Sequence, residues 1–159
     1  MAIAGIGVDI VALDRIERAL KRSPAFVRRV FWEDERHFCE HSSRKIAHYA
    51  MRWAAREAVV KALGTGFGKG IRYKDVEVCR QKGQAPFVKL HGKLKEHAES
   101  QGIIALHLSL SCTQSLAVAN ALALTEDALV KKEEKIDQKQ ILQSSFKEMR
   151  ALIDELEGM

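Results

Sequence analysis

The stretch from residue 44 to residue 63 constrains the fold more than any other part of the chain. Its apolar side chains recur at the three- and four-residue spacing of one helix face, at Ile46, Tyr49, Ala50, Trp53 and Val60. Glu57 lies in the middle of this apolar stripe. A carboxylate at such a position needs a partner, because burying an unpaired charge is costly. The stretch therefore predicts a long helix that presents one acidic group, followed by a glycine-rich loop over residues 64–70.

Residues 5–11 predict a β-strand with one buried face. Three apolar residues alternate there with two glycines and one aspartate: Ile6, Val8 and Ile10 with Gly5, Gly7 and Asp9. This is the two-residue period of a strand. Asp9 shares its face with the two glycines, which carry no side chains. We therefore expect open space, and hence a site, beside this carboxylate.

The remaining patterns complete an α+β fold. They predict helices near residues 13–22, 33–41 and 92–101, strands near residues 75–80 and 87–90, and a hairpin over residues 106–124. We expect an antiparallel sheet packed against the long helix, in one domain over residues 1–124. From residue 125 the chain becomes charged and rich in glutamine, with apolar residues stepping by four and three at Leu142, Phe146, Met149, Ile153 and Leu156. Residues 125–159 are therefore expected to form an amphipathic helical tail of unknown role.

Composition narrows the class of protein. The 159 residues are 47% hydrophobic and 30% charged, as in an ordinary globular protein. The three cysteines are far apart and form no Cys-x-x-Cys pair, so neither a disulfide framework nor a zinc site is indicated. The N-terminus does not resemble a signal peptide and no long apolar run occurs, so we expect a cytoplasmic protein without a membrane partner. The first 124 residues carry 20 Lys and Arg against 12 Asp and Glu, a balance that attracts acidic partners and phosphorylated ligands.

Asp9 and Glu57 admit two interpretations. Mg²⁺ prefers oxygen ligands and is typically held by one or two carboxylates together with substrate phosphates. Alternatively, Asp9 caps the next turn and Glu57 forms a helical salt bridge with Lys61, four residues further on. The loop at residues 64–70 is similarly ambiguous. Its backbone N–H groups suit a phosphate, but it follows a helix, whereas the known phosphate-binding loops follow a strand.

An arginine stripe lies on the first predicted helix and continues beyond it, at Arg15, Arg18, Arg22, Arg28 and Arg29. Such a stripe is either a solvated face or a dock for an acidic partner helix. Nucleic acid is not the expected partner, because aromatic residues are only 6% of the chain and no nucleic-acid-binding module is present.

Two other groups of residues are weaker candidates. His107, Ser109 and Ser111 share one strand face, but no acid is placed to orient the histidine as in a catalytic triad. His37 and His41 are spaced to face each other across a helical turn, yet no third zinc ligand lies nearby in the sequence.

Several motifs occur in order over residues 2–124. They are Gly5-Ile6-Gly7-Val8-Asp9-Ile10-Val11, Arg15-Ile16, Phe31 with Glu35, the block from Arg52 to Gly66, Asp75-Val76-Glu77-Val78, the turn at residues 83–86, and His107-Leu108-Ser109-Leu110-Ser111. This ordered set resembles the holo-acyl-carrier-protein synthases, the small 4′-phosphopantetheinyl transferases. The part from Glu57 to Gly66 is its most specific element.

The resemblance implies a Mg²⁺-dependent enzyme that moves phosphopantetheine from coenzyme A to a serine of acyl carrier protein and releases adenosine 3′,5′-bisphosphate. It implies that Asp9 and Glu57 bind the metal against the coenzyme A pyrophosphate, with Lys61 as a second positive group. The other implied coenzyme contacts are Arg52, Gly64, Thr65, Gly66, Pro86 and Ser109. The base that takes the serine proton stays open between Glu57 and a metal-bound water.

The resemblance also implies an assembly and a partner. The family is commonly trimeric, with coenzyme sites between subunits, so we expect a homotrimer with shared active sites. Acyl carrier proteins are acidic and present a helix. The arginine stripe would then be their dock.

Three features depart from the family pattern. Arg56 and Cys112 stand where many members have lysine and histidine, and the family core ends near Leu124. Two rival functions are a metal-dependent nucleotide or pyrophosphate hydrolase, and a basic scaffold that binds acidic protein or RNA without catalysis. Glu57 in an apolar stripe argues against the scaffold, which needs no carboxylate there.

Overall fold

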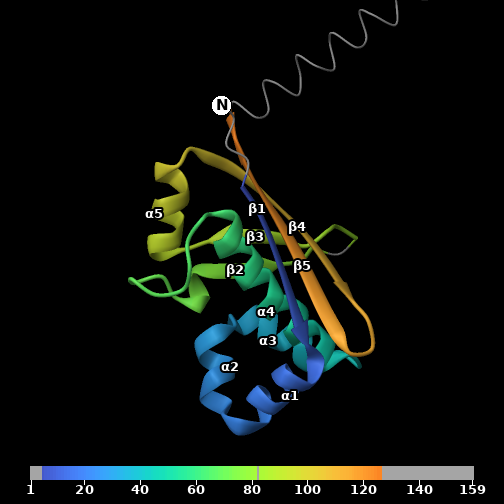
Figure 1. Cartoon of the computed structure of the whole chain (residues 1–159). Coiled ribbons are helices and arrows are strands. Elements are labelled where there is room, and N and C mark those ends of the chain that lie inside the picture. The colour runs from blue at the N-terminus through green and yellow to red at the C-terminus, as the bar shows by residue number, and fades with distance from the viewer. Residues whose placement is uncertain (1–4, 82, 127–159) are drawn as a thin grey trace, which may run out of the picture.

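A computed structural model of the chain describes residues 5–81 and 83–126 (Figure 1). Its elements are β1 (Gly5–Ala12), α1 (Leu13–Arg22), α2 (Pro24–Val30), α3 (Glu33–Glu40), α4 (Lys45–Ala62), the 3₁₀ turn η1 (Tyr73–Asp75), β2 (Val76–Cys79), β3 (Phe87–Leu90), α5 (Gly92–Ser100), β4 (Ile103–Cys112) and β5 (Leu116–Thr125). The five strands form one antiparallel sheet in the order β1-β5-β4-β3-β2. The predicted α+β fold, with the sheet packed against the long helix, is confirmed. Nearly all of the predicted tail lies outside the described residues.

The long helix α4 is the centre of the fold. It lies along β1 and β5, while α1, α2 and α3 gather around its first half and α5 lies near its end (Figure 1). Two rows of small residues allow this close approach. Ala54, Ala55, Ala58 and Ala62 of the helix are buried against the sheet, and so are Ala117, Ala119, Ala121 and Ala123 of β5.

The glycines of β1 are part of the same contact. A Cβ atom on Gly5 would lie 1.8 Å from the carbonyl oxygen of Ala62, and one on Gly7 would lie 1.9 Å from that of Ala58. The expectation that these glycines leave open space beside Asp9 is therefore wrong. The helix backbone fills the space, and the glycines bring α4 against the strand that carries Asp9.

The opposite face of β1 also differs from expectation. Ile6, Val8 and Ile10 were expected to be the buried residues of the strand, but they are 66%, 51% and 59% exposed in a single copy of the chain. In the register of the sheet they lie beside Leu122, Asn120 and Val118 of β5. The sheet thus buries its glycine and alanine face against α4, and its face of larger apolar side chains is open.

The sequence analysis missed the helix α2. Ser23 and Pro24, which follow the helix predicted near residues 13–22, begin α2. The hydroxyl of Ser23 accepts a hydrogen bond from the Phe26 N–H at 3.3 Å, and Pro24 occupies the first helical turn. Serine followed by proline is a recognised start signal, so this helix was predictable. None of the described helices has the length and apolarity to cross a membrane.

Candidate active site

The acidic pair is assembled by the contact between α4 and β1. Trp53, Glu57 and Lys61 follow one another at four-residue spacing and so form one ridge of α4, which we call the acidic ridge. Because the helix lies against β1, this ridge reaches Asp9. The Lys61 ammonium donates hydrogen bonds to the Asp9 carboxylate at 2.8 Å and to the Val8 carbonyl at 3.0 Å.

The charge on Glu57 is poorly compensated. Burial raises the pKa of the Glu57 carboxyl, the negative charge of Asp9 raises it further, and Lys61 and Arg15 partly oppose the shift. Among the described residues, no hydrogen-bond donor or cation contacts the Glu57 carboxylate. The helical salt bridge between Glu57 and Lys61 does not form, because the ammonium lies on Asp9 instead.

This arrangement fits a hard divalent cation. Two carboxylates that repel each other, one of them without a partner, are stabilised by a cation between them. Within residues 5–81 and 83–126 no group of three His, Cys, Asp or Glu side chains is placed to hold a metal. Mg²⁺ suits such an incomplete set, because it is usually bound by one or two carboxylates, waters and the phosphates of a substrate.

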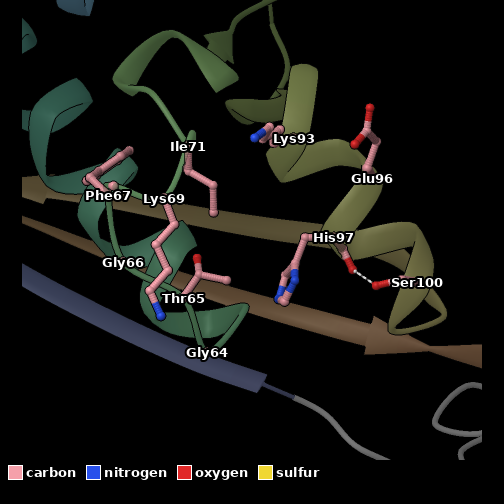
Figure 2. Close-up of a pocket in the computed structure, with 11 residues that line it drawn as sticks. Gly64, Thr65, Gly66, Phe67, Lys69, Ile71, Lys93, Glu96, His97 and Ser100 are labelled. Atoms are coloured by element: carbon pink, nitrogen blue, oxygen red, sulfur yellow. Dashed lines mark hydrogen bonds between the residues drawn. The ribbon is translucent and has the colours of Figure 1, made fainter.

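The glycine loop, which follows the helix that carries Glu57, lines a cleft (Figure 2). Gly64 has a φ of +67° and ends α4, and the following Thr65 N–H donates to the Val60 carbonyl at 2.9 Å. The cleft has a volume of about 730 Å³ and lies between the loop and α5. Lys69 and Lys93 supply positive charge on its two sides. The predicted residues Gly64, Thr65 and Gly66 all line it, so it offers a ligand room directly after the end of α4.

Tyr73 is a neighbour of Glu57 that the sequence analysis missed. Its ring stacks on Trp53 of the acidic ridge at 5.1 Å and lies against Phe67 at 4.1 Å. Burial raises the pKa of Tyr73, and the nearby Glu57 charge raises it further. No sequence signal marks this residue, because it reaches the site only after the glycine loop has turned back.

A second, basic ridge of α4 carries Arg52. Arg44, His48, Arg52 and Arg56 follow at four-residue spacing. Arg52 projects about 140° around the helix from Glu57. It is 4% exposed, and its guanidinium lies over the Phe38 ring at 4.6 Å. In one copy of the chain, therefore, Arg52 is not part of the acidic pair.

Arg52 has both a carboxylate and other cations around it, and its Nε lies 3.9 Å from Glu35 Oε1. Arg80 lies over the same phenyl ring at 5.3 Å, and Arg44 donates to the Cys112 sulfur at 3.0 Å. Burial lowers the pKa of His48, and the neighbouring arginines lower it further. The Arg52 Nε has no hydrogen-bond partner among the described residues. The four-residue spacing that forms this ridge was visible in the sequence.

Arg56, next in the same ridge, is entirely buried. Its guanidinium forms an ion pair with Glu35 of α3 and donates through Nε to the carbonyls of Val30 and Tyr73, each at 3.1 Å. One side chain thus ties α2, α3 and η1 to the helix that carries Glu57.

Two predicted coenzyme contacts lie elsewhere. Ser109 pairs with Asn120, which pairs with Val8, so Ser109 projects from the sheet face opposite to that of Asp9. Pro86 lies in the turn between β2 and β3. A single copy therefore brings Asp9, Glu57 and Lys61 together with the glycine loop, but not with Ser109 or Arg52.

The arginine stripe lies on α1 and α2. All five of its arginines are exposed: Arg15, Arg18, Arg22, Arg28 and Arg29. Arg18 pairs with Asp14 at 3.3 Å, and Arg15 is close enough to Glu57 to oppose the shift of its pKa. The stripe therefore begins next to the acidic pair.

Known proteins resemble this chain over its described part. The 4′-phosphopantetheinyl transferase superfamily matches residues 5–120. The holo-[acyl-carrier-protein] synthase of Alkaliphilus metalliredigens (strain QYMF) is 43% identical, over 76% of this chain and 98% of that protein. The corresponding synthase of Vibrio atlanticus (strain LGP32) is 37% identical, over 77% and 98%.

Solved structures give the same result. The Helicobacter pylori holo-[acyl-carrier-protein] synthase in complex with coenzyme A is 31% identical, covers 74% of this chain and 98% of its own, and has a TM-score of 0.66. The synthase from Bacillus anthracis str. Ames in complex with CoA (3′,5′-ADP) is 34% identical, with coverages of 79% and 99% and a TM-score of 0.64.

Proposed function

The chain belongs to the 4′-phosphopantetheinyl transferase superfamily, as a holo-[acyl-carrier-protein] synthase, and on this premise we propose that it transfers 4′-phosphopantetheine from coenzyme A to a serine of apo acyl carrier protein. The observation that carries the proposal is the arrangement of Asp9, Glu57 and Lys61 beside the glycine loop. This arrangement would combine a cation site with a phosphate site, as a pyrophosphate substrate requires.

The reaction exchanges one phosphorus–oxygen bond for another. The carrier serine oxygen bonds to the phosphorus that bears the pantetheine arm. The bond from this phosphorus to the bridging oxygen breaks, and the bridging oxygen leaves with adenosine 3′,5′-bisphosphate. The serine proton passes to Glu57 or to water.

The metal and the phosphates of the substrate would be held by Asp9, the acidic ridge and the glycine loop. Asp9 and Glu57 would hold Mg²⁺, which would polarise the reacting phosphate and offset charge on the leaving group. Lys61 adds a second positive charge at the same place. The glycine loop, with Lys69 and Lys93 nearby, would hold the phosphates on the nucleotide side.

We also propose a homotrimer whose copies share each coenzyme site. The open apolar face at Ile6, Val8 and Ile10 supports an interface between copies, because exposed apolar patches of this kind mark association surfaces. Arg52, Pro86 and Ser109 lie apart from the acidic pair of their own copy. A coenzyme that reaches them must then touch a second copy.

Mass spectrometry tests the reaction directly. The protein is incubated with apo acyl carrier protein, coenzyme A and Mg²⁺, and the carrier is examined for a phosphopantetheine adduct. We expect an adduct that disappears with EDTA and with Asp9→Ala or Glu57→Ala, and that persists with the exposed control Asp14→Ala. No adduct from the wild type, or one undiminished by the two site variants, rejects the proposal. A hydrolase would consume coenzyme A without any carrier, and a scaffold would leave it intact.

Complementation tests the shared site. Asp9→Ala and Arg52→Ala are each expected to be inactive, but mixed assemblies made by co-expression should regain activity, because some sites combine two intact halves. Light scattering should give a trimer, and Val8→Glu should dissociate it. Absence of complementation together with a monomeric wild type would reject a shared site while leaving the transfer reaction itself intact.

A further inference from the structure

The last strand of the sheet leads directly into a part of the chain that the family match does not include. The superfamily matches residues 5–120, and relatives aligned over 98% of their own length cover only 76–77% of this chain. β5 ends at Thr125, and the backbone of the next residue, Glu126, is already helical. The tail is therefore an addition to the shared fold, and the described chain ends as it enters a helix.

The sequence of the tail predicts one continuous helix with two parts. No glycine or proline occurs from residue 126 to residue 157, so no local signal ends a helix within that range. Nine of the ten residues from 131 to 140 are polar or charged, which predicts a solvated stem. Beyond the stem, apolar residues step by four, three, four and three, at Leu142, Phe146, Met149, Ile153 and Leu156. This spacing is that of the a and d positions of a coiled coil, and we call these five residues the seam.

The stem limits what the seam can contact. A helix from residue 126 to residue 141 is about 24 Å long. An unbroken helix of that length holds the seam away from the body of its own copy. A row of five large apolar side chains nevertheless favours association with another surface. The partner of the seam is therefore expected outside its own copy.

The proposed assembly supplies such a partner. Its association surface, at Ile6, Val8 and Ile10, lies on β1, and β1 pairs with β5 along its whole length. Gly5, at the start of β1, pairs with Ala123, close to the end of β5. The tail thus leaves from the edge of the surface through which the copies are proposed to meet. Rotation in a cyclic assembly places equivalent points of all copies at one level along its axis. The tails then start at one end of the assembly and run in the same sense.

We infer that the seams of the copies in one assembly pair with one another as a parallel coiled coil. The inference rests on the proposed homotrimer, and so predicts three paired tails. A seam of two heptads is short for a coiled coil that forms without other support. Copies already joined through β1 present their tails to one another at an effective concentration of about millimolar, at which a weak seam is sufficient. Seam and sheet face would then stabilise the same assembly, which should stay intact on dilution.

Dilution of the full-length protein tests the inference. Phe146→Asp with Ile153→Asp places two charges in the seam, seven residues apart. The matched control, Ser144→Asp with Ala151→Asp, places two charges at the same separation on the opposite side of the helix. In sedimentation velocity, the concentration of half-dissociation should rise at least about tenfold for the seam variant and change less than about twofold for the control. At concentrations where they remain assembled, both variants should transfer phosphopantetheine at the wild-type rate.

Cross-linking between copies gives a second measurement. Met149→Cys lies in the seam and Ala151→Cys lies opposite to it, so a short bismaleimide should join copies only through the first. Wild-type protein is the blank for Cys39, Cys79 and Cys112. Equal dissociation of the seam and control variants, or no cross-link in the Met149→Cys variant, would overturn the inference.

The remaining outcomes separate the inference from the proposals on which it rests. A seam variant that melts at a lower temperature but assembles like the wild type would place the seam on its own body, and would also overturn the inference. A monomeric wild type would reject the proposed assembly as well. An assembled wild type that forms no holo-carrier would instead reject the proposed reaction alone.

Discussion

We predict how much the buried ion pair of Glu35 and Arg56 contributes to the free energy of unfolding. Arg56 is 0% exposed and Glu35 is 2% exposed. Arg56→Met keeps most of the side-chain volume but removes every donor, and so leaves a buried carboxylate without its main partner. Removing one member of a buried pair costs about 3–5 kcal/mol. Glu35 would keep backbone donors from Trp32 at 2.9 Å and Val78 at 3.3 Å. Its Oε1 would also keep Arg52 Nε at 3.9 Å. We therefore expect the lower end, about 3 kcal/mol.

Urea unfolding at fixed protein concentration measures this cost, since association shifts apparent stability. We expect Arg56→Met to lower the midpoint without changing the slope. Adding Glu35→Gln should recover at least about half of the loss, because the amide carries no charge to bury. A loss below about 1 kcal/mol for the single variant would refute the reasoning. A double variant as unstable as the single one would also refute it, because the cost would then come from lost packing.

Three further predictions follow from the site and its supports. Arg15→Ala combined with Arg22→Ala should weaken carrier affinity and reduce its salt dependence, measured as KM against ionic strength, and unchanged kinetics would reject the dock. Because the pKa of Glu57 is raised, its ionised form costs stability; in EDTA, Glu57→Gln should therefore melt above the wild type near pH 8, and the difference should vanish as acid protonates Glu57. Mg²⁺ should stabilise the wild type but not this variant. Gly7→Ala should separate β1 from α4, because its Cβ would lie 1.9 Å from the Ala58 carbonyl oxygen. Metal binding should then be lost, and the protein should no longer unfold cooperatively at the melting temperature of the wild type.

Periodicity predicted most elements of this fold but not which faces meet. The long helix, the final hairpin and the strand Phe87–Leu90 follow from local spacing alone. The buried face of β1 did not, because alternation marks two faces without saying which one is covered. What decided it was the alanine-rich surface of α4, which packs closely only against residues as small as Gly5 and Gly7.

The candidate site, too, could be predicted from the sequence only in part. The acidic ridge could be predicted, because Glu57 and Lys61 are neighbours on any helix. The partner of Lys61 could not be predicted from helix spacing, because it depends on Asp9 of another element. Tyr73 was missed because stacking on Trp53 depends on the path of the intervening loop.

The positions of two ridges on α4 support the proposal that the active site is shared between copies. One ridge carries Trp53, Glu57 and Lys61, and the other carries Arg44, His48 and Arg52. Because Arg52 and Glu57 project about 140° apart on the same rigid helix, no small shift of the backbone brings both to one ligand within a copy. A coenzyme held by both ridges must therefore lie between the acidic ridge of one copy and the basic ridge of another. In that arrangement, the open apolar face of β1 would be part of the association surface that completes each site.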